Sequence, residues 1–137
     1  MSVGVVIVTH YRLGEEFLQA LRLIVPTAPG FRSVSIDPGQ SLEAMREAIR
    51  AGIRAADQGR GVLVLTDMFG GTPSNVSLSF LEENAVEVVT GVNLPMLIKL
   101  ATLREEKSLT DLAGFIRDYG RRNISVASAI RPEDTRD

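Results

Sequence analysis

Short apolar runs alternate along this chain with stretches in which apolar residues recur at helical spacing. The apolar runs, each rich in β-branched residues, are residues 3–8, 31–36, 62–65 and 85–90. The first and third contain almost no polar side chain, which predicts strands buried on both faces, as in a parallel sheet covered by helices. The second run is a weaker strand of the same kind.

The intervals between and after these runs predict five helices. Their start signals are Gly14, Ser41, the pair Thr72-Pro73, Pro95 and Ser108. Serine and threonine hydroxyls accept a hydrogen bond from the first helical turn, and proline suits that turn because its missing N–H has no partner there. Thr72 is therefore expected to cap the third helix, with Pro73 as its first residue.

The end of the chain has a different pattern. Residues 123–130 alternate between apolar and polar side chains, which predicts a last strand at a half-exposed edge of the sheet. Residues 131–137 form a polar tail. The whole chain of 137 residues has the size of one domain, which we expect to span residues 1–130.

Alternation of strands and helices predicts an α/β fold, with right-handed crossovers, a mostly parallel sheet and helices on both faces. In the doubly wound, flavodoxin-like strand order 2-1-3-4, the first and third strands are neighbours, and ligand sites form beyond their carboxyl ends. His10, the only histidine, ends the first strand, and Asp67 follows the third. The topology therefore predicts that His10 and Asp67 share one crevice.

Composition removes several classes of function. The net charge is −2 and the lysines and arginines are scattered, so no basic stripe favours nucleic acid or an anionic membrane. The absence of cysteine excludes thiolate sites, and a single histidine argues against a metal site. No apolar run approaches the ~20 residues of a membrane span, and no charged leader precedes residue 3. We expect a cytoplasmic protein.

The candidate site has the components of phosphoryl transfer. Unprotonated imidazole is a nucleophile near neutral pH, and a carboxylate that holds one ring N–H leaves the other nitrogen free to attack. Gly70 and Gly71 have no side chains to obstruct their backbone N–H groups beside a helix start, and this favours the binding of phosphate. On position alone, His10 is equally a strand-end histidine with local hydrogen bonds, and Asp67 is slightly better explained as a turn residue.

Three segments together resemble the enzyme IIA component of the mannose-type (mannose, fructose, sorbose) family of the phosphoenolpyruvate:sugar phosphotransferase system. They are Val-Ile-Val-Thr-His10, Leu-Thr-Asp67-Met-Phe-Gly-Gly-Thr-Pro-Ser-Asn75 and Thr-Gly91-Val-Asn-Leu-Pro-Met96. They occur in the family's order and at similar spacing, so the resemblance covers essentially the whole chain.

The resemblance implies a flavodoxin-like phosphotransferase that accepts a phosphoryl group on His10 from the phosphocarrier HPr and passes it to a IIB component. Asp67 would orient His10, Gly70, Gly71 and Thr72 would lie at the phosphoryl group, and no cofactor would be needed. The family commonly forms homodimers by exchanging the last strand, here residues 123–130. The IIB partner would be a separate polypeptide, and the membrane would be reached only through a IIC/IID transporter.

Partner docking is expected around the same site. Met68 and Phe69 are loop residues that are either buried plugs or, if exposed, part of a docking patch. Asn93 and Pro95 either shape a turn or form a wall of that surface. Tyr11 stands where the family usually has glycine, and the resemblance therefore implies an altered partner fit or transfer rate at this position.

Three other interpretations are open. A regulatory module would use the phosphorylation state of His10 to control protein binding without moving a sugar. The phosphoryl-donor subunit of dihydroxyacetone kinase has a related fold, but the loop at residues 68–75 is that of the mannose type. A flavin-binding flavodoxin is disfavoured because residues 9–14 lack a hydroxyl-rich phosphate cradle.

Overall fold

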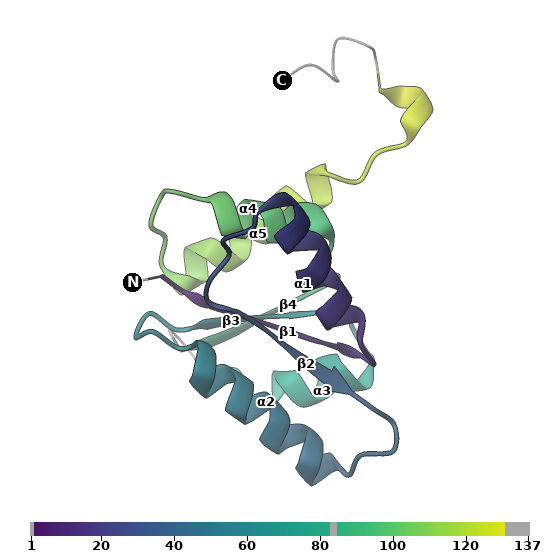
Figure 1. The fold of residues 1–137 in the computed structure, drawn as a ribbon, viewed down its shortest axis with the longest axis vertical. Coiled ribbons are helices and arrows are strands. Elements are labelled where there is room, and N and C mark those ends of the chain that lie inside the picture. Colours follow the sequence, from purple (N-terminus) through teal and green to yellow (C-terminus); the bar gives the residue numbers. More distant parts are fainter. Residues whose placement is uncertain (1, 83–84, 131–137) are drawn as a thin grey trace.

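The computed structural model describes residues 2–82 and 85–130, and it has a single sheet between two layers of helices (Figure 1). The strands are β1 (Gly4–His10), β2 (Phe31–Ile36), β3 (Val62–Thr66) and β4 (Val86–Thr90). All neighbouring strands are parallel, and their order is β2-β1-β3-β4. The predicted strand order is confirmed.

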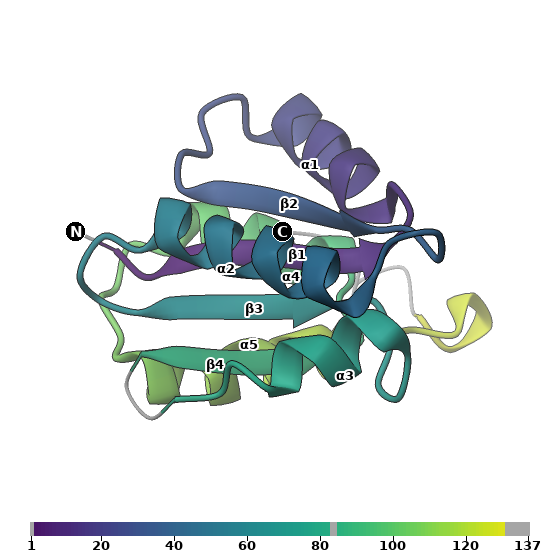
Figure 2. The same ribbon diagram turned by 90° about the horizontal axis from the view of Figure 1, so that it is seen from below.

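The helices divide between the two faces of this sheet. They are α1 (Leu13–Ile24), α2 (Leu42–Ala56), α3 (Thr72–Leu78), α4 (Leu94–Thr102) and α5 (Leu109–Arg122). Helices α1, α4 and α5 cover one face, and α2 and α3 cover the other (Figures 1 and 2). Among the described residues, no helix has both the length and the apolar character to cross a membrane.

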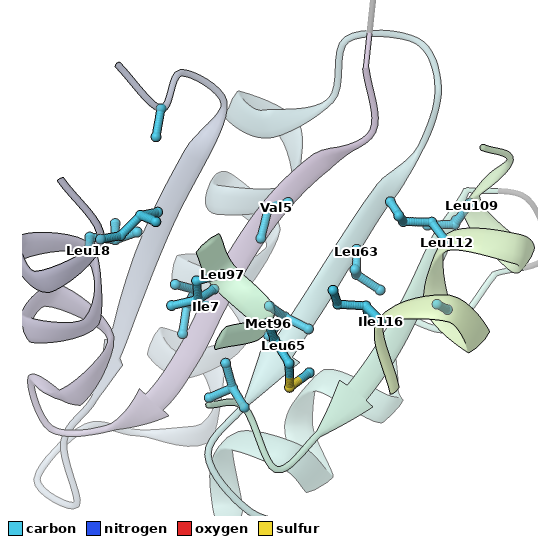
Figure 3. Packing of buried hydrophobic residues seen from close by; sticks show 14 residues of the cluster. Val5, Ile7, Leu18, Leu63, Leu65, Met96, Leu97, Leu109, Leu112 and Ile116 are labelled. Carbon is cyan, nitrogen blue, oxygen red and sulfur yellow. The ribbon is translucent and has the colours of Figure 1, made fainter. Parts of the chain in front are cut away.

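Burial of β1 and β3 on both faces explains their apolar sequences. Because successive strand residues point to opposite faces, Val5 and Ile7 contact the layer of α1, α4 and α5, whereas Val6 and Val8 face α2 and α3. Figure 3 shows the apolar cluster on the side of α1, α4 and α5, in which Ile7, Leu63 and Leu65 lie among Leu97, Met96 and Ile116. The two strands that carry the candidate site are therefore the most constrained in the fold.

Helix starts follow the predicted caps with one exception. The hydroxyls of Ser41 and Ser108 accept hydrogen bonds from the amides of Ala44 and Asp111. Helix α3 differs, because its N-cap is Gly71 in an extended conformation and Thr72 is its first residue. The expectation that Thr72 caps this helix was wrong: the first intrahelical bond runs from the Asn75 amide to the Gly71 carbonyl, at 2.9 Å, and no side chain caps the start.

The predicted last strand is not formed. The backbone N–H groups directly after α5 still donate to the last carbonyls of that helix. Farther along, residues 127–129 make a single 3-10 turn. Ile124 and Val126 are 75% and 72% exposed, on a segment that leads away from the helical layers (Figure 1). An alternating segment becomes a strand only beside an open strand edge, and this segment does not reach one. The predicted tail, residues 131–137, lies outside the described residues.

Candidate functional site

The site is built where β1 and β3 end together. The register of these adjacent parallel strands places Val8 beside Thr66, so that His10 and Asp67 leave the sheet at the same edge. The His10 ring Nδ1 lies 2.8 Å from Asp67 Oδ2. The topology predicted this convergence, and the structure confirms it.

Asp67 is held by backbone groups as well as by the ring. Its Oδ2 atom also accepts the backbone N–H of His10, at 3.0 Å, and its Oδ1 atom accepts the N–H of Met68, at 3.1 Å. The Asp67 side chain is 13% exposed, whereas that of His10 is 41% exposed. Because the carboxylate accepts, the ring proton sits on Nδ1, and Nε2 keeps its lone pair. The arrangement presents an accessible nucleophilic nitrogen.

Gly71 forms the surface against which the imidazole lies. A methyl group placed on Gly71 would lie 2.6 Å from His10 Cε1 and 3.2 Å from Nε2. Gly70 differs: it has φ +88, and a methyl group there would meet no atom within 4 Å. Gly70 is therefore needed for its left-handed backbone and Gly71 for space. Gly71, the N-cap of α3, thereby lies against the imidazole on the side of Cε1 and Nε2.

Tyr11 has an unusual backbone conformation directly after the histidine. Its φ is +48, and it is the one non-glycine residue with positive φ in the part of the chain that the structure describes. Glycine adopts this left-handed conformation freely, whereas a residue with a Cβ pays roughly 1–2 kcal/mol. This conformation would suit a glycine better, and Tyr11 is therefore a strained residue.

Exposed apolar side chains follow both His10 and Asp67 along the chain. Met68 and Phe69 are 53% and 72% exposed, so they are not buried plugs. Tyr11 and Leu13 are also exposed and follow the end of β1. Sequence reasoning did not include Leu13, because it placed the helix start at Gly14 and read Leu13 as part of the loop. The available signal was an apolar side chain three positions after His10.

Asn93 and Pro95 lie at the junction of α4 and α5. The Asn93 side chain caps α4 by accepting the Met96 N–H at 3.1 Å, and it donates to the Gly120 carbonyl, also at 3.1 Å. Pro95 is in the first turn of the helix, one residue after Leu94. Both polar groups of Asn93 are thus used in joining two helices, which favours the structural interpretation of this residue.

Within residues 2–82 and 85–130, no group of three or more potential ligands forms a metal site. The groups that the structure brings together at this edge of the sheet are His10, Asp67 and the backbone around Gly71. A carboxylate-oriented imidazole beside a helix start is suited to nucleophilic attack on a phosphoryl group.

Comparisons with known proteins cover most of this chain. The family model described as "PTS system fructose IIA component" matches residues 4–116. The "PTS system mannose-specific EIIAB component" of Escherichia coli K12 is 28% identical over 131 residues, which are 94% of this chain and 41% of that protein. This chain therefore spans about two fifths of the mannose-specific relatives.

A second relative and a solved structure extend the comparison. The "PTS system fructose-specific EIIA component" of Bacillus subtilis is 32% identical over 91 residues, 66% of this chain and 62% of that protein. The mannose/sorbose-specific IIA subunit from Enterococcus faecalis superposes with a TM-score of 0.82 at 28% identity, covering 92% of this chain and 95% of that one.

The contrast between the two glycines can be tested with alanine. Gly71→Ala should keep the fold, because φ is −82 there, but should push the ring away from Asp67. We expect the ¹⁵N spectrum of tag-free protein, in which His10 is the single histidine, to change from one tautomer to a mixture. Gly70→Ala should cost roughly 1–2 kcal/mol of stability and leave that spectrum intact. A Gly71→Ala spectrum like that of the wild type would contradict this role.

Proposed function

This chain belongs to the mannose-type IIA family of the phosphotransferase system, and we propose that it is a phosphoryl carrier that accepts a phosphoryl group on His10 from phospho-HPr and passes it to a IIB component. The observation that carries the proposal is the 2.8 Å bond between His10 Nδ1 and Asp67 Oδ2, which leaves Nε2 free at an accessible surface. The carrier domain would be residues 1–130, acting in the cytoplasm.

In the proposed reaction, the Nε2 lone pair attacks phosphorus as the bond between phosphorus and the donor breaks. The new P–N bond places positive charge on the imidazole, which the Asp67 carboxylate stabilises through the Nδ1 proton. The Met68 and His10 backbone amides hold that carboxylate in place. In transfer to the IIB component, the P–N bond at His10 breaks as a bond between phosphorus and the acceptor forms. The Nδ1 proton stays in place, so the site needs no other proton donor.

Two neighbouring features support the proposal. In the turn of Gly70, Gly71 and Thr72, Gly71 lies against the imidazole, and backbone N–H groups of this turn and of the α3 start would favour the phosphoryl oxygens. The exposed side chains of Tyr11, Met68 and Phe69 would form the docking surface for HPr and the IIB component. Asn93 and Pro95 would contribute to docking by fixing the loop that follows β4.

We also propose a homodimer in which residues 123–130 are exchanged. The outer edge of β4 has no neighbouring strand among the described residues. A groove of about 510 Å³ lies between β4 and α5, with Gly114 and Thr110 among its lining residues. The exposed Ile124 and Val126 of a second copy would fill this groove and pair with β4.

The carrier function is tested by intact mass. Incubation with phosphoenolpyruvate, enzyme I and HPr should add one phosphoryl group that is labile in acid and stable in base. His10→Ala should add none, because the chain has no other imidazole. Omitting HPr from the wild-type reaction is the control for direct donation, and labelling that persists in His10→Ala would refute the mechanism.

Asp67→Asn tests the orienting role. The amide keeps the shape but neither fixes the tautomer nor stabilises the positive ring, so transfer from phospho-HPr should slow by roughly 10²-fold or more. Rapid-quench measurement of the transfer rate decides this. Asp57→Asn is a matched control, because Asp57 Oδ1 also accepts a backbone N–H, that of Gly59, in the loop leading into β3. Equal rates for the two variants would reduce Asp67 to a turn residue.

Sedimentation velocity tests the exchange. The wild type should sediment as a dimer, and Val126→Glu should shift it to monomer, because a carboxylate would enter the groove between β4 and α5. Leu23→Glu, which changes an apolar residue on α1 that is more exposed than Val126, should remain dimeric. A monomeric wild type would disprove the dimer and leave the carrier function untouched.

A further inference from the structure

The turn that follows His10 is held by a buried hydroxyl. Thr9 precedes the histidine, is fully buried, and points its hydroxyl into the start of α1. That hydroxyl donates to the Tyr11 carbonyl at 3.3 Å and accepts the Gly14 N–H at 2.8 Å. The Thr9 hydroxyl therefore both donates and accepts in the connection between His10 and α1.

Helix α1 depends on this hydroxyl because its own cap is missing. The N-cap residue, Arg12, accepts no hydrogen bond from a backbone N–H of the first turn, and its guanidinium instead pairs with the Glu15 side chain at 3.0 Å. The N–H of Gly14 would otherwise have no partner in the helix. Thr9 thus performs the capping that normally falls to the N-cap side chain.

The same hydroxyl acts on the strained residue. The Tyr11 N–H donates to the Ile36 carbonyl at 2.9 Å, and its carbonyl accepts from Thr9. The left-handed conformation of Tyr11 is therefore held at both ends of the residue. Strained conformations of this kind persist only where the surroundings hold them, and they concentrate at functional sites.

We propose that Thr9 is a positioning residue for His10: its hydroxyl holds Tyr11 in the left-handed turn and so keeps the His10 ring against Asp67. Without it, Tyr11 relaxes toward negative φ, the peptide between His10 and Tyr11 rotates, and the contact between Nδ1 and Oδ2 loosens. The need for this hold comes from the tyrosine side chain, because glycine adopts the same turn without strain. The effect on phosphoryl transfer rests on the proposed carrier function.

The test is a double-mutant cycle of Thr9→Val with Tyr11→Gly. Valine keeps the shape of threonine without its hydrogen bonds, so Thr9→Val should mix the His10 tautomers and slow transfer from phospho-HPr roughly tenfold. Thr9→Ser should behave like the wild type. Tyr11→Gly should remove most of the Thr9→Val defect, a rescue that a general loss of packing would not show.

Thr66→Val is the matched control. Thr66 ends the neighbouring strand and is as buried as Thr9, but its hydroxyl has no hydrogen-bond partner among the described residues. This variant should leave the His10 spectrum and the transfer rate unchanged. If Thr9→Val alone does not fold, the double variant with Tyr11→Gly should fold, because the strain that the hydroxyl opposed is gone.

Three outcomes would overturn the proposal: a wild-type His10 spectrum in Thr9→Val, a double variant as impaired as Thr9→Val, or equal effects of Thr9→Val and Thr66→Val. The ¹⁵N spectrum is recorded on unphosphorylated protein. It therefore decides the role of Thr9 even if the wild type takes no phosphoryl group from HPr, in which case the carrier function alone fails.

Discussion

The parallel pairing of β1 with β3 is the constraint on which the rest of the site depends. Two strands buried on both faces cannot slide without exposing apolar side chains, so the register that puts Val8 beside Thr66 is strongly determined. That register in turn places His10 and Asp67 within hydrogen-bonding distance, although 57 positions separate them in the sequence. The functional geometry is thus a consequence of core packing.

Many features of the fold and the site could be predicted, because they depend on the chemistry of single side chains or on the spacing of apolar residues. The strand at residues 31–36 and the caps at Ser41 and Ser108 follow from side-chain pattern and hydroxyl chemistry, and the structure agrees with them. The meeting of His10 and Asp67 followed from strand order. The family-typical residues then favoured phosphoryl transfer over the interpretation of Asp67 as a simple turn residue.

Other features depend on contacts that no sequence pattern encodes. Gly71, and not Thr72, is the N-cap of α3, and the ring of His10 occupies the space where a side chain at position 71 would stand. Residues 123–130 have the period of a strand, but within one chain they have no open edge beside them. The hydrogen bond from Thr9 to Tyr11 was not predicted either, since no sequence pattern gives a backbone φ or the direction of a buried hydroxyl.

One oxygen of Asp67 bonds both the backbone N–H and the ring Nδ1 of the same residue, His10. The two hydrogen bonds therefore close a ring of atoms that includes Asp67 Oδ2 and the Cα and Cβ atoms of His10. Such a closure restricts both side-chain torsions of His10 relative to its own backbone. The direction of the imidazole is then set by β1 itself, and any group that approaches Nε2 meets a ring of fixed orientation.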